Sequence, residues 1–155
     1  MSYKILKDIC ARLPYGVKVE LTNNGYHHEN IAKRGDKTID TLKGFTGKYF
    51  TIHHDNPLDW DWSDSEIEVE DIKPYLFPLS SMTEELWDKE FSGYGITEFT
   101  RDSFKYGCET LEFNNSNPNL SSIVRFINQL IKNHFDIYGL IPMGLAIDAT
   151  SLNIY

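Results

Sequence analysis

The stretch VKVEL (residues 17–21) alternates apolar and charged side chains without a break. Successive side chains of a strand point to opposite faces of a sheet, so this stretch predicts a strand that is buried on one face. Residues 38–42, 48–54 and 66–70 predict three more short strands. In the last of these, two β-branched residues alternate with three glutamates, which places the carboxylates on the solvent face. Four short strands predict a small, strongly bent sheet or a partly open barrel.

Helical spacing precedes the first strand. Leu6, Ile9, Cys10 and Leu13 recur at i, i+3, i+4 and i+7, which is the period of one helix face. The proline and glycine of residues 14–16 end the pattern. The sequence therefore predicts a helix that leads into the sheet.

A second helix is predicted after the strands. The sequence SMTE (residues 81–84) has the form of a capping box, in which a serine and a glutamate satisfy backbone amides at a helix start, and Thr83 is the alternative cap. We expect a short helix through Leu86, Trp87 and Phe91, ended by the glycines that follow.

The strongest helical pattern covers residues 120–134. Its apolar residues are Leu120, Ile123, Val124, Ile127, Leu130 and Ile131. We expect this helix to pack on the sheet and to bury Ile123, Ile127 and Leu130. Residues 96–99 and 110–113 are two weak strand candidates, and the apolar tail of residues 139–148 is expected to pack back onto the sheet.

Together these elements predict a single α+β domain over residues 1–155. The length of 155 residues suits one domain, and the chain has neither a linker nor a low-complexity tract. The predicted architecture is a small, bent, mostly antiparallel sheet or partly open barrel, packed by two or three helices.

The negative charge of the chain is concentrated in DNPLDWDWSDSEIEVED (residues 55–71). This window holds 8 of the 23 acidic residues and neither Lys nor Arg, so the rest of the chain has 15 acids against 15 bases. Tryptophans beside concentrated charge predict a contact surface, because large aromatic side chains anchor interfaces. The residues predicted to bind a partner are Asp59, Trp60, Asp61, Trp62, Asp64, Glu66 and Glu68. The alternative is a solvated loop beside an edge strand.

A basic region in the first 50 residues gives another alternative. It has nine bases against five acids and includes Lys33, Arg34 and Lys37. These residues predict a ligand site for a signalling nucleotide, which a homo-oligomer would sequester. A pI near 5.0 argues against direct binding of nucleic acid, which needs clustered Lys and Arg.

His53, His54 and Asp55 invite a third alternative, a metal-dependent hydrolase, because imidazole and carboxylate groups bind zinc and iron. Adjacent residues on a strand point to opposite faces, so the two histidines cannot both bind one ion there. The sequence contains no phosphate-loop or nucleophile-elbow motif. We therefore predict no catalytic residue, no metal and no cofactor, and a protein that is not an enzyme.

Three stretches resemble one known family. IKPYLFPLSSMTEE (residues 72–85), NHFDIYGLIPMGLAID (residues 133–148) and LKDICARLPYGVKV (residues 6–19) are similar to the hallmark segments of small uncharacterised proteins. Phages, prophages and mobile elements of gut anaerobic bacteria encode this family. It has no established activity, so the resemblance implies a phage or mobile-element origin and no reaction.

The resemblance and the charged window together predict an accessory protein that binds a host macromolecule, above all a host protein, as an inhibitor of host defence. The N-terminus lacks the apolar segment of a signal peptide, and no apolar run approaches the roughly 20 residues of a membrane span. We therefore expect the protein in the cytoplasm of the host bacterium, with no membrane partner.

Overall fold

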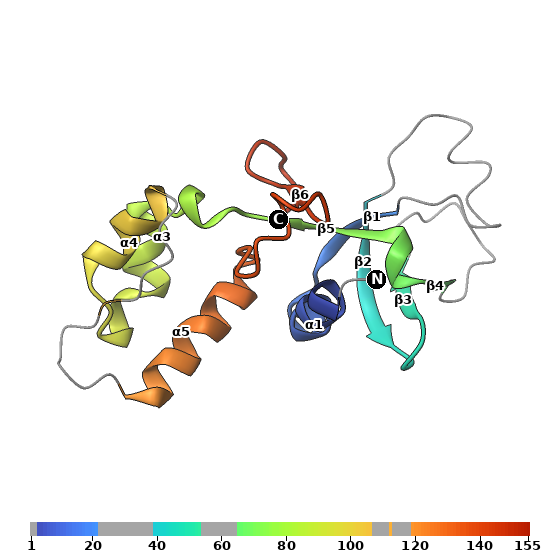
Figure 1. Ribbon diagram of the computed structural model, residues 1–155, viewed down its shortest axis with the longest axis horizontal. Coiled ribbons are helices and arrows are strands. Elements are labelled where there is room, and N and C mark those ends of the chain that lie inside the picture. The colour runs from blue at the N-terminus through green and yellow to red at the C-terminus, as the bar shows by residue number, and fades with distance from the viewer. Residues whose placement is uncertain (1–2, 22–38, 54–64, 107–111, 113–118) are drawn as a thin grey trace.

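The computed structural model describes residues 3–21, 39–53, 65–106, 112 and 119–155. These residues form an α+β fold, as the sequence predicts, with a mixed sheet and a group of helices beside it (Figure 1). The described strands are β1 (Lys18–Leu21), β2 (Ile39–Phe45), β3 (Phe50–His53), β4 (Ser65–Ile67), β5 (Ile72–Leu76) and β6 (Ile147–Asp148). The described α-helices are α1 (Tyr3–Arg12), α3 (Glu84–Glu90), α4 (Glu98–Lys105) and α5 (Leu120–Lys132). Four 3-10 turns join them: η1 (Leu13–Tyr15), η2 (Val69–Asp71), η3 (Leu79–Ser81) and η4 (Ser92–Tyr94).

The sheet is open, with its described strands in the order β4-β3-β2-β1-β5-β6. All neighbouring pairs are antiparallel except β5 and β6, which run parallel, so the predicted mostly antiparallel sheet is confirmed. The alternating stretch forms β1, which pairs with β2 on one side and with β5 on the other. Val17 and Val19 are fully buried, so the apolar positions of the alternation face the core.

The strand predicted over residues 66–70 is too long. β4 ends at Ile67, and the 3-10 turn η2 follows, closed by a hydrogen bond that the Asp71 amide donates to the Glu68 carbonyl (3.0 Å). The turn redirects the chain from β4 at one edge of the sheet to β5, on the far side of β1. Val69 is still buried and its neighbouring glutamates are exposed. The alternation therefore predicts burial correctly and backbone conformation only in part.

α1 lies beside the sheet and shares one hydrophobic core with it (Figure 1). This confirms the first predicted helix. The core also takes in residues of the returning tail, as predicted, because Leu140 and Ala146 are buried in it. Its buried members are Ile5, Ile9, Val17, Val19, Leu42, Phe50, Val69, Ile72, Leu76, Leu140 and Ala146.

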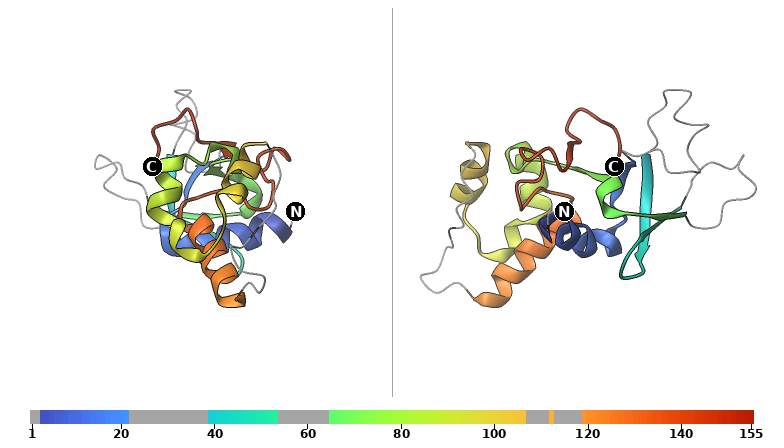
Figure 2. Two further views of the ribbon diagram at one scale, coloured as in Figure 1. Left: turned by 90° about the vertical axis from the view of Figure 1, so that its left-hand side faces the viewer. Right: turned by 45° about the vertical axis from the view of Figure 1, so that its right-hand side comes forward.

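A second core, rich in aromatic side chains, holds α3, α4 and α5 together. The Phe126 ring of α5 lies 5.4 Å from the Phe91 ring, 6.0 Å from the Trp87 ring and 6.4 Å from the Phe104 ring. These helices stand beside the sheet, not over it (Figures 1 and 2). The prediction that the helix of residues 120–134 packs on the sheet is therefore wrong, because the aromatic residues of α3 and α4 cover its buried face.

The weak strand candidate over residues 96–99 is confirmed only at its start. Ile96 forms a β-bridge, and the Thr97 amide donates to the Glu112 carbonyl (3.0 Å), which belongs to the other candidate. From Glu98 on the chain is in α4, where Thr100, Arg101, Ser103 and Phe104 are buried at helical spacing. The described residues thus contain four α-helices where two or three were predicted. The other candidate, residues 110–113, lies outside the described residues except for Glu112.

The buried residues of α5 agree with the prediction only in part. Leu130 is buried as predicted, together with Phe126 and Ile131, whereas Ile123 and Ile127 are only half-buried. The helix ends at Lys132, two residues earlier than predicted. His134 has a φ of 59°, the left-handed conformation that terminates many helices.

The chain crosses between the two cores twice, and the crossings are hydrogen-bonded side by side. Phe77 leaves the sheet after β5, and Phe135 returns after α5; the two form a parallel bridge. The Phe77 amide donates to the His134 carbonyl (2.9 Å), and the Asp136 amide donates to the Phe77 carbonyl (2.8 Å). Beyond this crossing β6 pairs with β5, which completes the predicted return of the tail.

Candidate functional site

The acidic window predicted to bind a partner lies mostly outside the described residues. This holds for Asp59, Trp60, Asp61, Trp62 and Asp64. Glu66 belongs to β4, and Glu68 is exposed immediately before η2. Partner binding by this window therefore stays a prediction.

The two alternative sites also lie mostly outside the described residues. The basic residues Lys33, Arg34 and Lys37 lie outside the described residues. His53 is the last residue of β3, while His54 and Asp55 follow beyond the described part. Where the structure is described, no group of three or more His, Cys, Asp or Glu residues could hold a metal ion.

The described surface does present an apolar contact face, on α5. Leu120 is 72% exposed and Val124 is 48% exposed, and Ile127 is half-buried beside them. At 100° per residue these three side chains fall within about 60° of one another on the helix. Phe126 points into the aromatic core about 120° away around the helix. Ile131, which is in line with the three residues but nearer the C-terminal end, is buried. We call Leu120, Val124 and Ile127 the outer face of α5.

Polar residues border the outer face. The exposed polar side chains of α5 are Ser121, Arg125, Asn128 and Lys132, and the helix contains no Asp or Glu. Asn119 caps the N-terminus by accepting a hydrogen bond from the Ser121 amide (2.9 Å). The exposed part of α5 thus has an apolar strip and, on another side of the helix, a polar strip with two cationic groups.

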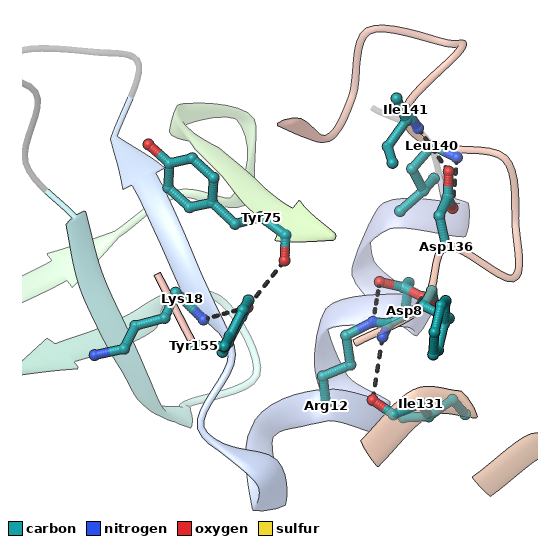
Figure 3. A network of polar contacts seen from close by, with 10 residues as sticks. Asp8, Arg12, Lys18, Tyr75, Ile131, Asp136, Leu140, Ile141 and Tyr155 are labelled. Atoms are coloured by element: carbon teal, nitrogen blue, oxygen red, sulfur yellow. Dashed lines mark hydrogen bonds and ion pairs between the residues drawn. The ribbon is translucent and has the colours of Figure 1, made fainter. Parts of the chain in front are cut away.

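A second candidate is a cluster of polar side chains, buried except for part of Tyr155, where α1, the end of α5 and the sheet meet. We call Asp8, Arg12, His134, Asp136 and Tyr155 the polar junction. Figure 3 shows much of it.

Asp8 and Arg12 form an ion pair that is fully buried. The guanidinium donates from Nε to Asp8 Oδ2 and from Nη2 to Asp8 Oδ1, each over 2.7 Å. It also donates to the carbonyls of Ile131 (3.2 Å) and Phe135 (2.6 Å), so it caps the C-terminal end of α5 (Figure 3). Burial raises the pKa of the Asp8 carboxyl, and the hydrogen bonds from Arg12 limit that rise.

His134 is buried and stacks on Tyr155, with the ring centroids 4.0 Å apart. Burial, helped by the positive charge of Arg12, lowers the pKa of His134 to about 4. Its Nδ1 atom is buried and has no hydrogen-bond partner among the residues that the structure describes. The imidazole is therefore neutral at ordinary pH and acts as a flat, stacked surface.

Tyr155 joins two strands through its hydroxyl. This group accepts a hydrogen bond from the Lys18 amide (3.0 Å) and donates one to the Tyr75 carbonyl (2.9 Å) (Figure 3). Although Tyr155 is 44% exposed as a whole, the hydroxyl lies between β1 and β5, and burial raises its pKa to about 12. The phenol thus continues the β1–β5 hydrogen bonding past the last paired residues.

Asp136 completes the junction. Its two carboxylate oxygens accept hydrogen bonds from the amides of Leu140 and Ile141, each over 2.8 Å (Figure 3). The charged groups of the junction are thus bonded to each other and to backbone groups. These hydrogen bonds hold the side chains in fixed positions and occupy the polar atoms of both carboxylates and of the guanidinium. We therefore assign the junction a structural role.

The junction joins distant parts of the chain. α1 supplies Asp8 and Arg12, the segment after α5 supplies His134 and Asp136, and Tyr155 bonds to Tyr75 of β5. The sequence analysis missed the ion pair, although two opposite charges at i and i+4 inside a helical pattern were the available signal.

None of the helices in the described parts of the chain has the length and apolar character of a membrane span. α5 has 13 residues, against the roughly 20 that cross a bilayer. Comparisons of the chain with models of protein families, with curated proteins and with solved structures find no match. What the chain binds is therefore inferred from its own surface chemistry.

Proposed function

We propose that this chain is a non-enzymatic binding protein, an accessory protein of a phage or mobile element that acts in the cytoplasm of the host bacterium. It would occupy a host protein and thereby inhibit it, as an inhibitor of host defence does. The observation that carries the proposal is the outer face of α5, which exposes Leu120 and Val124 on a helix that buries Phe126, Leu130 and Ile131. The resemblance of residues 6–19, 72–85 and 133–148 supports the origin.

The rigidity of α5 supports a binding role. Asn119 caps its first turn, Phe126 and Leu130 anchor its middle in the aromatic core, and Arg12 holds the carbonyls at its end. A contact face that is already ordered loses little conformational entropy when a partner binds. Large apolar side chains that stay exposed on such an element are typical of an interaction site.

The acidic window of residues 55–71 is the second surface of this proposal. Its carboxylates would speed the encounter with a basic region of the partner and make binding sensitive to salt. Trp60 and Trp62 would add apolar anchors. The two surfaces differ in charge, so they can be tested separately.

The test is capture of a partner from lysate of the host bacterium by three purified proteins. These are the wild type, the double variant Leu120→Ser/Val124→Ser, and the matched control Tyr106→Ser, which removes an apolar side chain that is 84% exposed outside α5. We expect the wild type and the control to capture the same protein, and the double variant to lose about tenfold or more in affinity, since hot-spot residues contribute at least 2 kcal/mol in total.

Equal capture by all three proteins would refute a role of α5. The pair Trp60→Ala/Trp62→Ala in the same series then decides whether the acidic window is the contact. If neither change reduces capture and salt has no effect, the proposed function is wrong.

A further inference from the structure

Each core is built from its own part of the chain. The described members of the second core all lie between Phe77 and Ile137, and those of the first core lie before or after this range. The helices α3, α4 and α5 are thus inserted into the chain of the sheet, and Figure 1 shows them on one side of it. We call residues 77–137 the helical unit. It is joined to the rest of the molecule at the crossing where Phe77 and Phe135 form their bridge.

In the described structure the polar junction holds the helical unit beside the sheet. Arg12 of α1 donates a hydrogen bond to the carbonyl of Ile131 at the end of α5. The His134 ring, which belongs to the helical unit, stacks on Tyr155, and the hydroxyl of Tyr155 is bonded to β1 and β5. Polar contacts between two parts of a chain separate more readily than an apolar core does. A junction of this kind can therefore open while both cores stay packed.

His134 is poorly placed to carry a positive charge. Its ring is buried, and its Nδ1 atom has no hydrogen-bond partner among the described residues. A protonated imidazole has two N–H donors and a charge, and burying either without a partner costs free energy. The backbone carbonyl of the same residue accepts the hydrogen bond of the Phe77 amide at the crossing. Displacement of the ring would therefore disturb the crossing directly.

The charged and titratable groups around His134 come from several elements. They are Asp8 and Arg12 of α1, Lys132 at the end of α5, Asp136 after the crossing, and Tyr155. In Figure 3 the side chains of Lys18 and Tyr75, on β1 and β5, point away from the junction. The positive charge of Arg12 opposes protonation of His134. Burial raises the pKa of Asp8, so proton uptake by Asp8 favours the closed junction as the pH falls. Opening in acid would therefore come from His134.

We propose that the polar junction is an acid-sensitive latch. Protonation of His134 expels its ring and opens the crossing, so that the helical unit separates from the sheet while both cores stay folded. Burial, helped by Arg12, lowers the pKa of His134 to about 4 in the closed junction, against an ordinary value of 6.5. This difference shifts the balance between the closed and the open junction by about 30-fold from pH 8 to pH 5. The inference goes beyond the proposed function and does not depend on it.

The test is native-state hydrogen exchange, which measures local opening around individual amides. The Phe77 amide reports on the crossing, the Leu42 amide on the first core and the Phe91 amide on the second, since each is hydrogen-bonded to a backbone carbonyl there. Exchange is measured at several low concentrations of urea, because its urea dependence grows with the surface that an opening exposes. The proteins are the wild type, His134→Asn and the control His53→Asn, which removes a histidine of β3.

We expect the Phe77 amide to be less protected than the Leu42 and Phe91 amides and to depend less on urea, because it exchanges through a local opening. In the wild type and the control its protection, corrected for the intrinsic exchange rate, should fall about 30-fold from pH 8 to pH 5. In His134→Asn it should not fall, since asparagine does not titrate and tolerates the φ of 59° at this position.

Equal protection and equal urea dependence of all three amides would overturn the latch, because the crossing would then open only when the whole molecule unfolds. A constant protection of Phe77 in the wild type would overturn it too, and so would a fall that persists in His134→Asn. If His134→Asn does not fold, NMR titration of the His134 ring in the wild type decides. A ring that is protonated at about pH 5 while the Phe77 amide keeps its protection contradicts the inference.

Discussion

Arg12 shows how a single buried side chain links distant elements. It is fully buried, and its guanidinium bonds to Asp8 on its own helix and to the carbonyls of Ile131 and Phe135. Removing a guanidinium from water costs several kcal/mol, which is offset only when its N–H groups find partners. Arg12 therefore belongs to the fold as a bonded unit with Asp8 and the end of α5.

Arg12→Met should destabilise the protein by about 3–5 kcal/mol, because it leaves the Asp8 carboxylate buried without its partner. Urea unfolding measures this change. Arg125→Met is the control, since its side chain is exposed and its replacement should change stability by less than about 0.5 kcal/mol. The double variant Asp8→Leu/Arg12→Met should be more stable than Arg12→Met alone; if it is less stable, the penalty does not come from an unpaired charge.

His134 should make stability depend on pH. Its pKa is about 4 in the folded protein against an ordinary value of 6.5, so the unfolded chain takes up the proton first as the pH falls. The contribution of the neutral ring is complete above pH 6.5 and is lost between pH 6.5 and 4. The pKa difference corresponds to roughly 3 kcal/mol.

The measurement is the free energy of unfolding of the wild type and of His134→Asn at several pH values. Asparagine tolerates the φ of 59° at this position and does not titrate. The wild type should lose more stability than the variant between pH 6.5 and 4. Parallel curves would mean that the buried histidine is protonated as easily as a free one.

At the scale of elements, α1 and α5 show what local periodicity can and cannot predict. Both helices were predicted, because apolar side chains recur at helical spacing. The face of α1 was predicted in part: Ile9 is buried, together with Ile5, Asp8 and Arg12, whereas Leu6, Cys10 and Leu13 are half-buried against the same core. The burial of these two charges depends on carbonyls at the end of α5, which accept hydrogen bonds from Arg12. These carbonyls lie more than 100 residues away in the chain.

The same reason explains the error on α5. Its apolar residues cover a wide arc of the helix, and the aromatic side chains of α3 and α4 determine which part of that arc is covered. The outer face of α5 could not be predicted from the sequence for a related reason, because an apolar residue of a helix is expected to lie in a core. That Leu120 and Val124 stay exposed becomes visible only when the neighbouring helices are placed.

Truncation should reveal the true core face of α5. Phe126→Ala should cost about 3–5 kcal/mol, since it opens a cavity among four aromatic rings. Ile127→Ala should cost less than half as much because Ile127 is half-buried. Urea unfolding of both variants measures the difference. Equal costs would place Ile127 in the core and restore the packing expected from periodicity.

At the scale of the whole molecule, two cores are joined by two neighbouring crossings. The chain leaves the sheet at Phe77 and returns at Phe135, and hydrogen bonds tie these points together. Arg12 adds a third connection between α1 and α5, and Tyr155 secures the strands beside the crossing. The sequence predicted the strands and the returning tail, but not the division into two cores. That division depends on contacts between segments that are far apart in the chain.

These connections determine the order in which the molecule can assemble. The bond from Arg12 to Ile131 spans 119 residues and the bond from Lys18 to Tyr155 spans 137, whereas the β2–β3 turn needs only neighbours such as Thr46 and Tyr49. Long loops are entropically costly to close, so we expect the junction to form late. Pulsed hydrogen exchange during refolding should protect the Thr46 amide before the Lys18 amide, and the reverse order would contradict this. Each newly made chain would then exist for a time as two unconnected cores, with the surfaces that later meet between them open to other chains.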